Sequence, residues 1–187
     1  MPFDVQRELL TALRLPAFAK ATADKPAAVP FVSVDPHRPV TEETLDEWRE
    51  VLADADAFFP GQDELLLEGV EEDPHRALPR LVNGRLRFVV FKRGAKGGIL
   101  YDAHDKRFHS WEARVSSVVD HTGAGDAFAL GLVLAHLEGL PMDDCLQRAV
   151  VTSSFAVEGW GPEALLTATR ADAEGRLREW YGGGRQR

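Results

Sequence analysis

The stretch that decides the fold is VVDHTGAGDAF, at residues 118–128. An apolar approach ends at Asp120, small residues follow as far as Asp126, and a largely apolar run begins after that. This pattern predicts a strand end or loop that turns into a helix, with residues 123–126 as the first helical turn.

The predicted first turn has the features of an anion site. Gly123 and Gly125 lack a Cβ atom, so backbone N–H groups there can approach a ligand closely. N–H groups at the start of a helix have no partner within the helix, and the helix dipole adds partial positive charge. Asp126 would lie beside the bound anion, where a carboxylate suits removal of a proton from an attacking hydroxyl.

A second interpretation of the same turn stays open from the pattern alone. Residues 123–125 could form a plain tight turn, with Asp126 a first-turn charge that the helix dipole favours. Two common nucleotide-binding patterns do not occur in the chain, namely G-x-x-x-x-G-K-[ST] and G-x-G-x-x-G.

Composition indicates an ordinary globular chain. The 187 residues are enough for one sizeable core, with 44% hydrophobic and 28% charged residues. A net charge of −8 argues against a nucleic-acid or anionic-membrane partner. No apolar run reaches about 18 residues and no signal segment begins the chain, so we expect no membrane span. The single cysteine, Cys145, suits a reducing cytoplasm and is expected to be a buried, small apolar residue.

Short strands alternate with helical stretches, which is typical of βαβ units and a parallel sheet. The apolar face of the first helix after a strand is predicted to comprise Leu45, Trp48, Val51 and Leu52. The expected elements are a helix at 4–14, strands at 29–34, 55–59 and 86–91, a helix capped by Thr41, a helical region at 64–70, a further helical piece at 74–81, a hairpin of 97–101 and 107–111, and helices at 123–137, 143–157 and 171–181.

Polar residues follow the predicted strands at the ends where such sheets bind ligands. Asp35 and Arg38 follow the first strand, residues 60–64 the second, and residues 92–94 the third. We expect these groups to converge on the loop at 123–126, which favours the catalytic interpretation of that loop. The whole chain, 1–187, is expected to form a single partial domain, with a loop or insertion at 15–28 and a flexible tail at 182–187.

Residues 120–126, DHTGAGD, resemble the D-T-x-G-A-G-D signature of the ribokinase-like (PfkB) carbohydrate kinase family. The resemblance implies an α/β fold with a mostly parallel sheet flanked by helices, truncated at the N-terminus. It implies that the backbone of Gly123, Ala124 and Gly125 forms an anion hole for the transferred phosphoryl group. Asp126 would be the general base on the acceptor hydroxyl.

Two further segments are similar to family patterns. FPGQDEL, at residues 59–65, lies where the family has F-P-N-x-x-E-L, whose Asn and Glu help to organise Mg²⁺. Glu64 matches that Glu, and Gly61 replaces the Asn. FKRGAKGG, at residues 91–98, resembles a strand end near the nucleotide phosphates and implies nucleotide contacts for Lys92.

Several of the remaining candidate site residues have two possible roles. Gly94 and Thr122 are further expected nucleotide contacts from the resemblance. Lys92 could instead be a solvated charge at a strand end. VDPHR, at residues 34–38, is similar to the family's D-P-N-x-R, where Asp35 and Arg38 could bind a cation or pair with each other. Asp120 could bind a monovalent cation or fix the loop by accepting backbone N–H groups.

The resemblance covers residues 4–168 and corresponds to the C-terminal half of the family's chain. It implies an enzyme that uses ATP and Mg²⁺, with a monovalent cation as a further candidate, to phosphorylate a hydroxyl of a sugar or related alcohol. The alternative is a non-catalytic nucleotide-binding remnant that lacks the acceptor pocket and lid. Candidate partners beyond the small-molecule substrate are a second copy, forming a homodimer, and a separately encoded N-terminal half.

Overall fold

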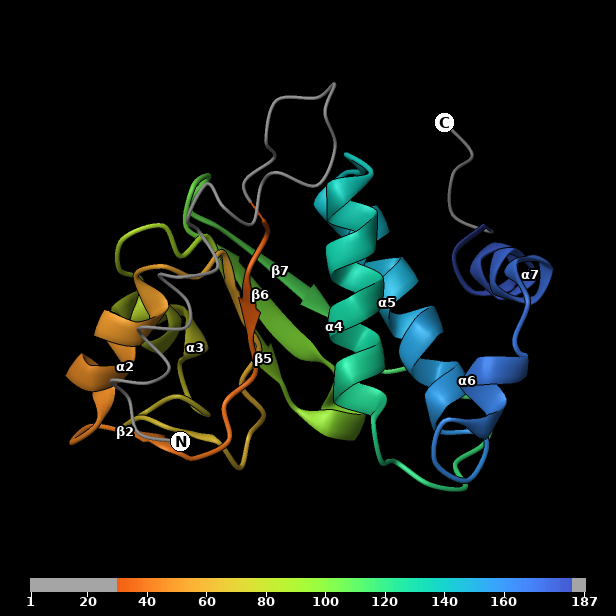
Figure 1. The fold of residues 1–187 in the computed structure, drawn as a ribbon, viewed down its shortest axis with the longest axis horizontal. Helices are drawn as coiled ribbons and strands as arrows, with labels where there is room; N and C mark the ends of the chain where they lie inside the picture. Colours follow the sequence, from red (N-terminus) through yellow and green to blue (C-terminus); the bar gives the residue numbers. More distant parts are fainter. Residues whose placement is uncertain (1–29, 183–187) are drawn as a thin grey trace. The chain divides into compact units, whose positions relative to one another are not determined.

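The computed structural model of the protein describes residues 30–182 (Figure 1). The helix expected at 4–14 and the loop or insertion expected at 15–28 lie outside these residues, as does the tail after Gly182. The described chain forms two compact units. The first contains the residues up to Arg93 and Gly98–Ser110, and the second contains Gly94–Gly97 and the residues from Trp111 onward.

The first unit is built on a five-stranded sheet with the order β1-β3-β5-β6-β7. Three strands run in parallel, and β6 is antiparallel to β5. The sheet therefore confirms the mostly parallel α/β arrangement expected from the sequence. The strands are β1 (Ser33–Val34), β3 (Ala57–Phe58), β5 (Phe88–Lys92), β6 (Gly98–Asp102) and β7 (Arg107–Trp111).

The strand β5 is apolar along most of its length because both of its faces are covered. Phe88, Val89, Val90 and Phe91 are all fully buried. A continuous apolar run of this kind is typical of a strand inside a parallel sheet. Its burial explains why the sequence predicts this strand clearly.

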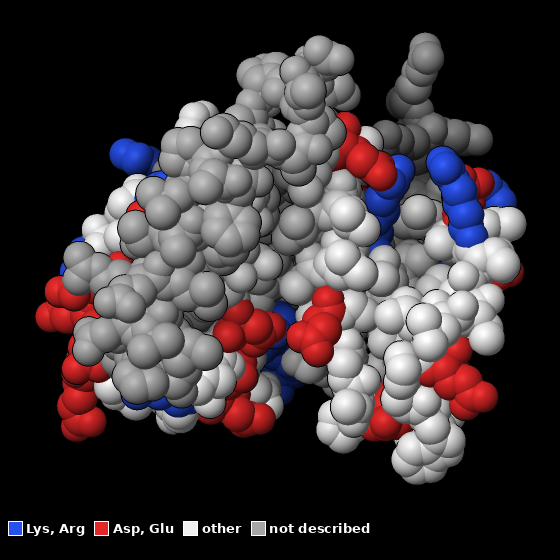
Figure 2. Space-filling view, in the orientation of Figure 1, with Lys and Arg blue, Asp and Glu red and all other residues white. Residues whose placement is uncertain are grey.

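The helix α2 (Leu45–Leu52) buries the four residues predicted to form its apolar face. Its first turn carries Asp46 and Glu47, where the helix dipole favours negative charge, and acidic side chains gather over this helix in Figure 2. The predicted cap at Thr41 is wrong, since Thr44 is the N-cap residue. Thr41 belongs to the extended strand β2 (Val40–Thr41), so it cannot begin a helix.

The helical region predicted at 64–70 is also wrong. Leu65–Leu66 forms the strand β4, which pairs in parallel with β2. The chain then turns through Gly69, whose φ of 72° lies in the left-handed region that favours glycine. The helical piece predicted at 74–81 is confirmed as α3 (Pro74–Ala77) followed by the short 3₁₀ helix η1 (Leu78–Leu81).

The second unit is helical, and its two longest helices pack closely. Gly131 in α4 lies against α5, because a Cβ atom added there would be 2.7 Å from Thr152 Oγ1 and 3.0 Å from the Ala149 Cα atom. Cys145 in α5 is buried. The elements are η2 (Gly94–Lys96), α4 (Ala124–Leu137), α5 (Met142–Ala156), α6 (Glu163–Thr167) and α7 (Arg170–Tyr181). Within residues 30–182, none of the helices is both long enough and apolar enough to cross a membrane.

The α4–α5 contact gives a matched test of packing. Gly131→Leu should lower the free energy of unfolding by about 1–3 kcal/mol, the usual cost of overpacking a close contact. Gly175→Leu in α7 is the control, because nothing lies within 4 Å of a Cβ atom added there. It should leave stability unchanged or raise it by roughly 0.5–1 kcal/mol through better helix propensity. Urea unfolding of both variants measures the difference, and equal effects would show that Gly131 does not limit the packing.

Candidate active site

The helix α4 begins as the sequence predicts, with Gly123 as its N-cap residue. Gly123 has φ 77° and ψ 0°, and no side chain caps the helix N-terminus. L-residues with a side chain rarely adopt this left-handed conformation, which accounts for glycine here. A helix N-terminus without a side-chain cap can offer its N–H groups and its dipole to an anion.

Asp126 lies in the first turn of α4 and is exposed. Together with Asp120 it bounds the segment 120–126, which we call the α4 turn. An exposed carboxylate beside a helix N-terminus is accessible to a ligand that binds there. This placement is what a general base acting on a bound substrate requires, although it also suits a first-turn charge.

Asp120 holds the α4 turn together through its two carboxylate oxygens. Its Oδ1 atom accepts the Thr122 N–H at 3.0 Å and the Thr122 hydroxyl at 2.8 Å. Its Oδ2 atom accepts the Gly161 N–H at 3.1 Å. These donors, led by the Thr122 N–H, hold the pKa of Asp120 below its ordinary value.

The segment after α5 also meets the backbone before the α4 turn. The Val157 carbonyl accepts the Val119 N–H at 2.8 Å and, at 3.4 Å, the Asp120 N–H. Neither Val157 nor Gly161 was among the residues expected at the site, and Val157 fell at the end of the helix expected at 143–157. Both residues act through backbone atoms, which leave little signal in the residue types.

Polar groups of the first unit gather where its parallel strands end. Asp35 follows β1 and Lys92 ends β5, and Lys92 Nζ lies 2.7 Å from Asp35 Oδ2. The Lys92 side chain is only 17% exposed, so the pair shields a charge that would otherwise be costly. Arg38 is partly buried in the same strand-end segment.

Gly61 and Glu64 follow β3 at the same edge of the sheet. The Glu64 Oε2 atom accepts the Gly61 N–H at 2.6 Å, and the Lys92 N–H donates to the Pro60 carbonyl at 2.9 Å. A Cβ atom at position 61 would lie 3.1 Å from that Oε2 atom, so glycine lets the carboxylate fold back onto the backbone. Within this unit, the structure therefore brings Asp35, Gly61, Glu64 and Lys92 together.

The second unit contains the other predicted site residues. These are Asp120, Thr122, Gly123, Ala124, Gly125 and Asp126 in the α4 turn, and Gly94 at the start of η2. Gly94 has φ 53°, a left-handed conformation that its lack of a side chain allows.

A metal ion would find few protein ligands in the described part of the chain. No group of three or more His, Cys, Asp or Glu residues there could hold one. Mg²⁺ bound with a nucleotide commonly uses one or two carboxylates together with phosphate oxygens and water. Glu64 and Asp35 are carboxylates at the sheet edge where the parallel strands end, and in the structure they contact the Gly61 N–H and Lys92, respectively.

The Thr122 hydroxyl allows a direct test of the contacts that hold the α4 turn. Thr122→Val removes one donor to Asp120, so the pKa of Asp120 should rise toward about 3.9, the ordinary aspartate value. Since the folded-state pKa is lowered, ionised Asp120 stabilises the fold above the unfolded pKa, and this stability is lost as the pH falls through the folded value. Thr122→Val should therefore lose less stability than the wild-type chain as the pH falls through that range. A ¹³C-NMR titration of the carboxyl group measures the pKa, and an unchanged value would contradict the role of the hydroxyl.

Comparison with known proteins identifies the family. Residues 6–168 match the pfkB family of carbohydrate kinases, and the chain belongs to this family. It is 30% identical over 133 residues to a cytidine kinase of Thermococcus kodakarensis, an alignment that covers 70% of this chain and 48% of the relative. It is 28% identical over 163 residues to a ribokinase of Arabidopsis thaliana, covering 82% of this chain and 40% of the relative.

Solved structures show the same fold. The structure of Arabidopsis thaliana ribokinase complexed with ribose and ATP aligns with a TM-score of 0.68 and 21% identity, covering 95% of this chain and 53% of that one. A putative ribokinase II from E. coli in complex with ATP and Mg²⁺ aligns with a TM-score of 0.58 and 25% identity, covering 80% of this chain and 49% of that one. The chain spans about half the length, or less, of these relatives.

Proposed function

We propose that the chain carries the phosphoryl-transfer part of an ATP-dependent kinase that acts on a hydroxyl of a sugar or related small molecule. The observation that carries the proposal is the α4 turn, where Asp126 lies in the first turn of a helix whose N-terminus has no side-chain cap. The kinase relatives that bind or act on ribose, cytidine and ATP support it.

In the proposed reaction, the acceptor oxygen attacks the γ-phosphorus of ATP. The bond from that phosphorus to the β,γ-bridging oxygen breaks, and ADP leaves. Asp126 accepts the proton of the attacking hydroxyl. Backbone N–H groups of residues 123–125 stabilise the charge on the transferred phosphoryl group.

Other residues have supporting roles in the proposal. Lys92, Gly94 and Thr122 are the nucleotide contacts that the family resemblance implies, and Lys92 would exchange its bond to Asp35 for one to a phosphate. Glu64 holds Mg²⁺, which when bound supplies further neutralisation of the phosphates. A monovalent cation at Asp120, a homodimer, a separately encoded N-terminal half and a cytoplasmic location stay predictions.

A non-catalytic nucleotide-binding remnant is the second candidate function. One observation favours it, since the Glu64 carboxylate already accepts the Gly61 N–H. This candidate keeps nucleotide binding and lacks turnover, so kinetics and titration together separate the two.

The substitution Asp126→Asn tests the catalytic role. The amide keeps the size of the carboxylate but cannot accept the proton, so turnover should fall by about 10²–10⁴-fold. ATP affinity should hold or rise, because a negative charge beside the phosphates is removed. Phosphoryl transfer from ATP is measured with a panel of sugars and nucleosides, and ATP binding by isothermal titration.

The control is Asp143→Asn, since Asp143 is a first-turn acid of α5. If each of the two carboxylates only favours the start of its helix, both substitutions should have small and equal effects on turnover, because Asn also suits a helix start. Turnover close to wild type in Asp126→Asn would reject the catalytic role. Absence of ATP binding to a folded sample would reject both candidate functions.

Gly61→Asn tests the magnesium role of Glu64. The new Cβ atom would lie 3.1 Å from the Glu64 carboxylate, which must shift by a few tenths of an ångström, and the added amide oxygen is a second candidate metal ligand beside it. The amide and the carboxylate together should bind metal more readily than Glu64 alone and lower the dissociation constant of Mg²⁺·ATP by up to ~10-fold, or about 1.4 kcal/mol. Gly175→Asn in the helix α7 is the control, since nothing lies within 4 Å of a Cβ atom there and its φ is not left-handed. If Gly61→Asn binds ATP equally tightly in the presence of Mg²⁺ and in the presence of EDTA, the magnesium role of Glu64 is contradicted.

A further inference from the structure

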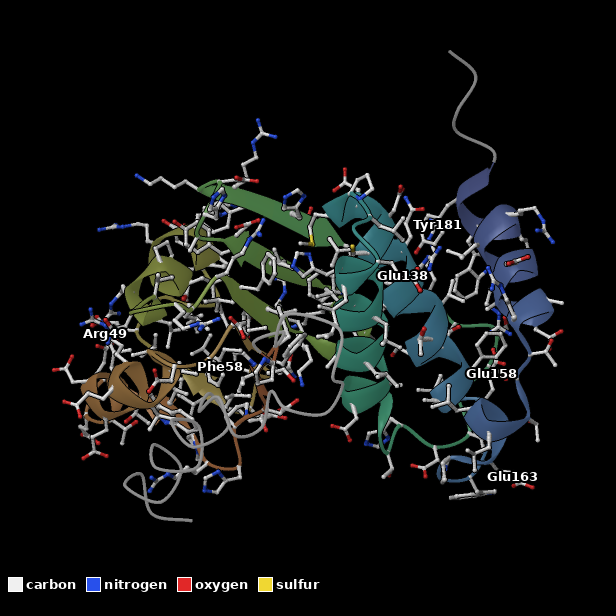
Figure 3. The ribbon with its side chains drawn as sticks, turned by 45° about the horizontal axis from the view of Figure 1, so that its top comes forward. Arg49, Phe58, Glu138, Glu158, Glu163 and Tyr181 are labelled. Atoms are coloured by element: carbon white, nitrogen blue, oxygen red, sulfur yellow. The ribbon has the colours of Figure 1, made fainter. Side chains whose placement is uncertain are left out.

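One ion pair of the second unit is well shielded from solvent. Arg176 in α7 pairs with Glu158, which follows α5, and their side chains are 16% and 18% exposed. The Arg176 Nη1 atom lies 2.9 Å from Glu158 Oε1, and its Nη2 atom donates to Oε2 at 3.0 Å. Figure 3 shows Glu158 on the side of α5 toward α7. The hydrogen bond from Nη2 and the close approach of Nη1 together hold the carboxylate against the guanidinium.

The Arg176 guanidinium has further contacts at the end of α5. Its Nη1 atom donates to the Ser154 hydroxyl at 2.7 Å, and that buried hydroxyl donates to the Val151 carbonyl at 2.7 Å. Its Cζ atom lies 3.8 Å from the centroid of the Phe155 ring and 5.3 Å from that of Trp180. A flat cation stacked on an aromatic ring is held more tightly than an exposed one.

Glu158 lies between the two residues that hold the α4 turn. Val157, the residue before it, accepts the Val119 N–H, and Gly161, three residues after it, donates to Asp120. Whatever fixes Glu158 therefore fixes the direction in which the chain leaves α5 and reaches Asp120. The other Arg–Glu pairs described in this unit are more exposed, such as Arg148–Glu138 at 41% and 60%.

We propose that Arg176 is a positioning residue for the α4 turn, acting through Glu158 and the segment from Val157 to Gly161. The hydrogen bonds and the ion pair described for Arg176 go to Ser154 and Glu158, outside the turn. Loss of the pair should release the Val157–Gly161 segment and loosen Asp120, while α4 itself stays folded. This proposal rests on the proposed function at one point, namely that the α4 turn binds the nucleotide.

Amide hydrogen exchange of the full chain tests the positioning role. Arg176→Met and Glu158→Gln should each lower protection at the Val119 and Gly161 amides by at least about tenfold. The amide of Leu132, in the buried interior of α4, should keep its protection. Arg176→Lys keeps the charge without the planar guanidinium and should show a smaller loss, which is informative if Arg176→Met does not fold.

Arg148→Met is the matched control, because it breaks an exposed Arg–Glu pair on α5. It should leave all three amides unchanged. Unchanged protection at Val119 and Gly161 in folded Arg176→Met or Glu158→Gln would overturn the proposal. A parallel loss at Leu132 would also overturn it, since that result describes a general loss of stability.

Isothermal titration with Mg²⁺·ATP then tests the link to the nucleotide. The dissociation constant should rise by about tenfold in Arg176→Met and stay unchanged in Arg148→Met. An unchanged constant in Arg176→Met would overturn that link. If the wild-type chain binds no ATP, the proposed function fails, while the exchange experiment still decides whether Arg176 positions the turn.

Discussion

The carboxylate of Asp120 is the contact on which the second unit's candidate site depends. One of its oxygens holds Thr122 within the turn, and the other holds Gly161 from the segment after α5. The α4 N-terminus is therefore tied to a part of the chain some forty residues away. At the helix start the Ala124 N–H donates to the His121 carbonyl at 3.2 Å, which closes the turn locally but does not tie it to the rest of the unit. The Asp120 contacts hold the turn without occupying that helix start.

In the first unit, parallel strands bring together residues that are distant in sequence. A parallel sheet places the ends of β1, β3 and β5 at one edge, which brings Asp35 and Lys92 within 2.7 Å although they are far apart in sequence. An amine that is only 17% exposed needs a partner, and the carboxylate supplies it. Lys92 can therefore remain ordered and charged at the sheet edge, where a phosphate could later compete for it.

The sequence predicts those parts of the structure whose signals are local. The apolar run of β5, the four-residue face of α2 and the glycine start of α4 are each visible within a few residues. The interpretation failed at 64–70, where the apolar residues are also consistent with a strand. Leu65 and Leu67 are buried whereas Leu66 is 51% exposed. Burial therefore alternates from residue to residue, as in a strand, and does not follow the helical period. Pairing with Val40 decides this, and that partner is remote in sequence.

The parts of the candidate site that escaped prediction are likewise held by remote backbone groups. Val157 contributes a carbonyl and Gly161 an N–H, which almost any residue type could supply. Arg176 lies within the helix expected at 171–181, where the sequence singled out no residue. Only its shielding, together with its stacking on Phe155, separates it from the exposed Arg170–Glu174 pair of the same helix. Residue type can thus identify the group expected to do chemistry, such as Asp126, whereas the contacts that orient it must be sought in the packing around it.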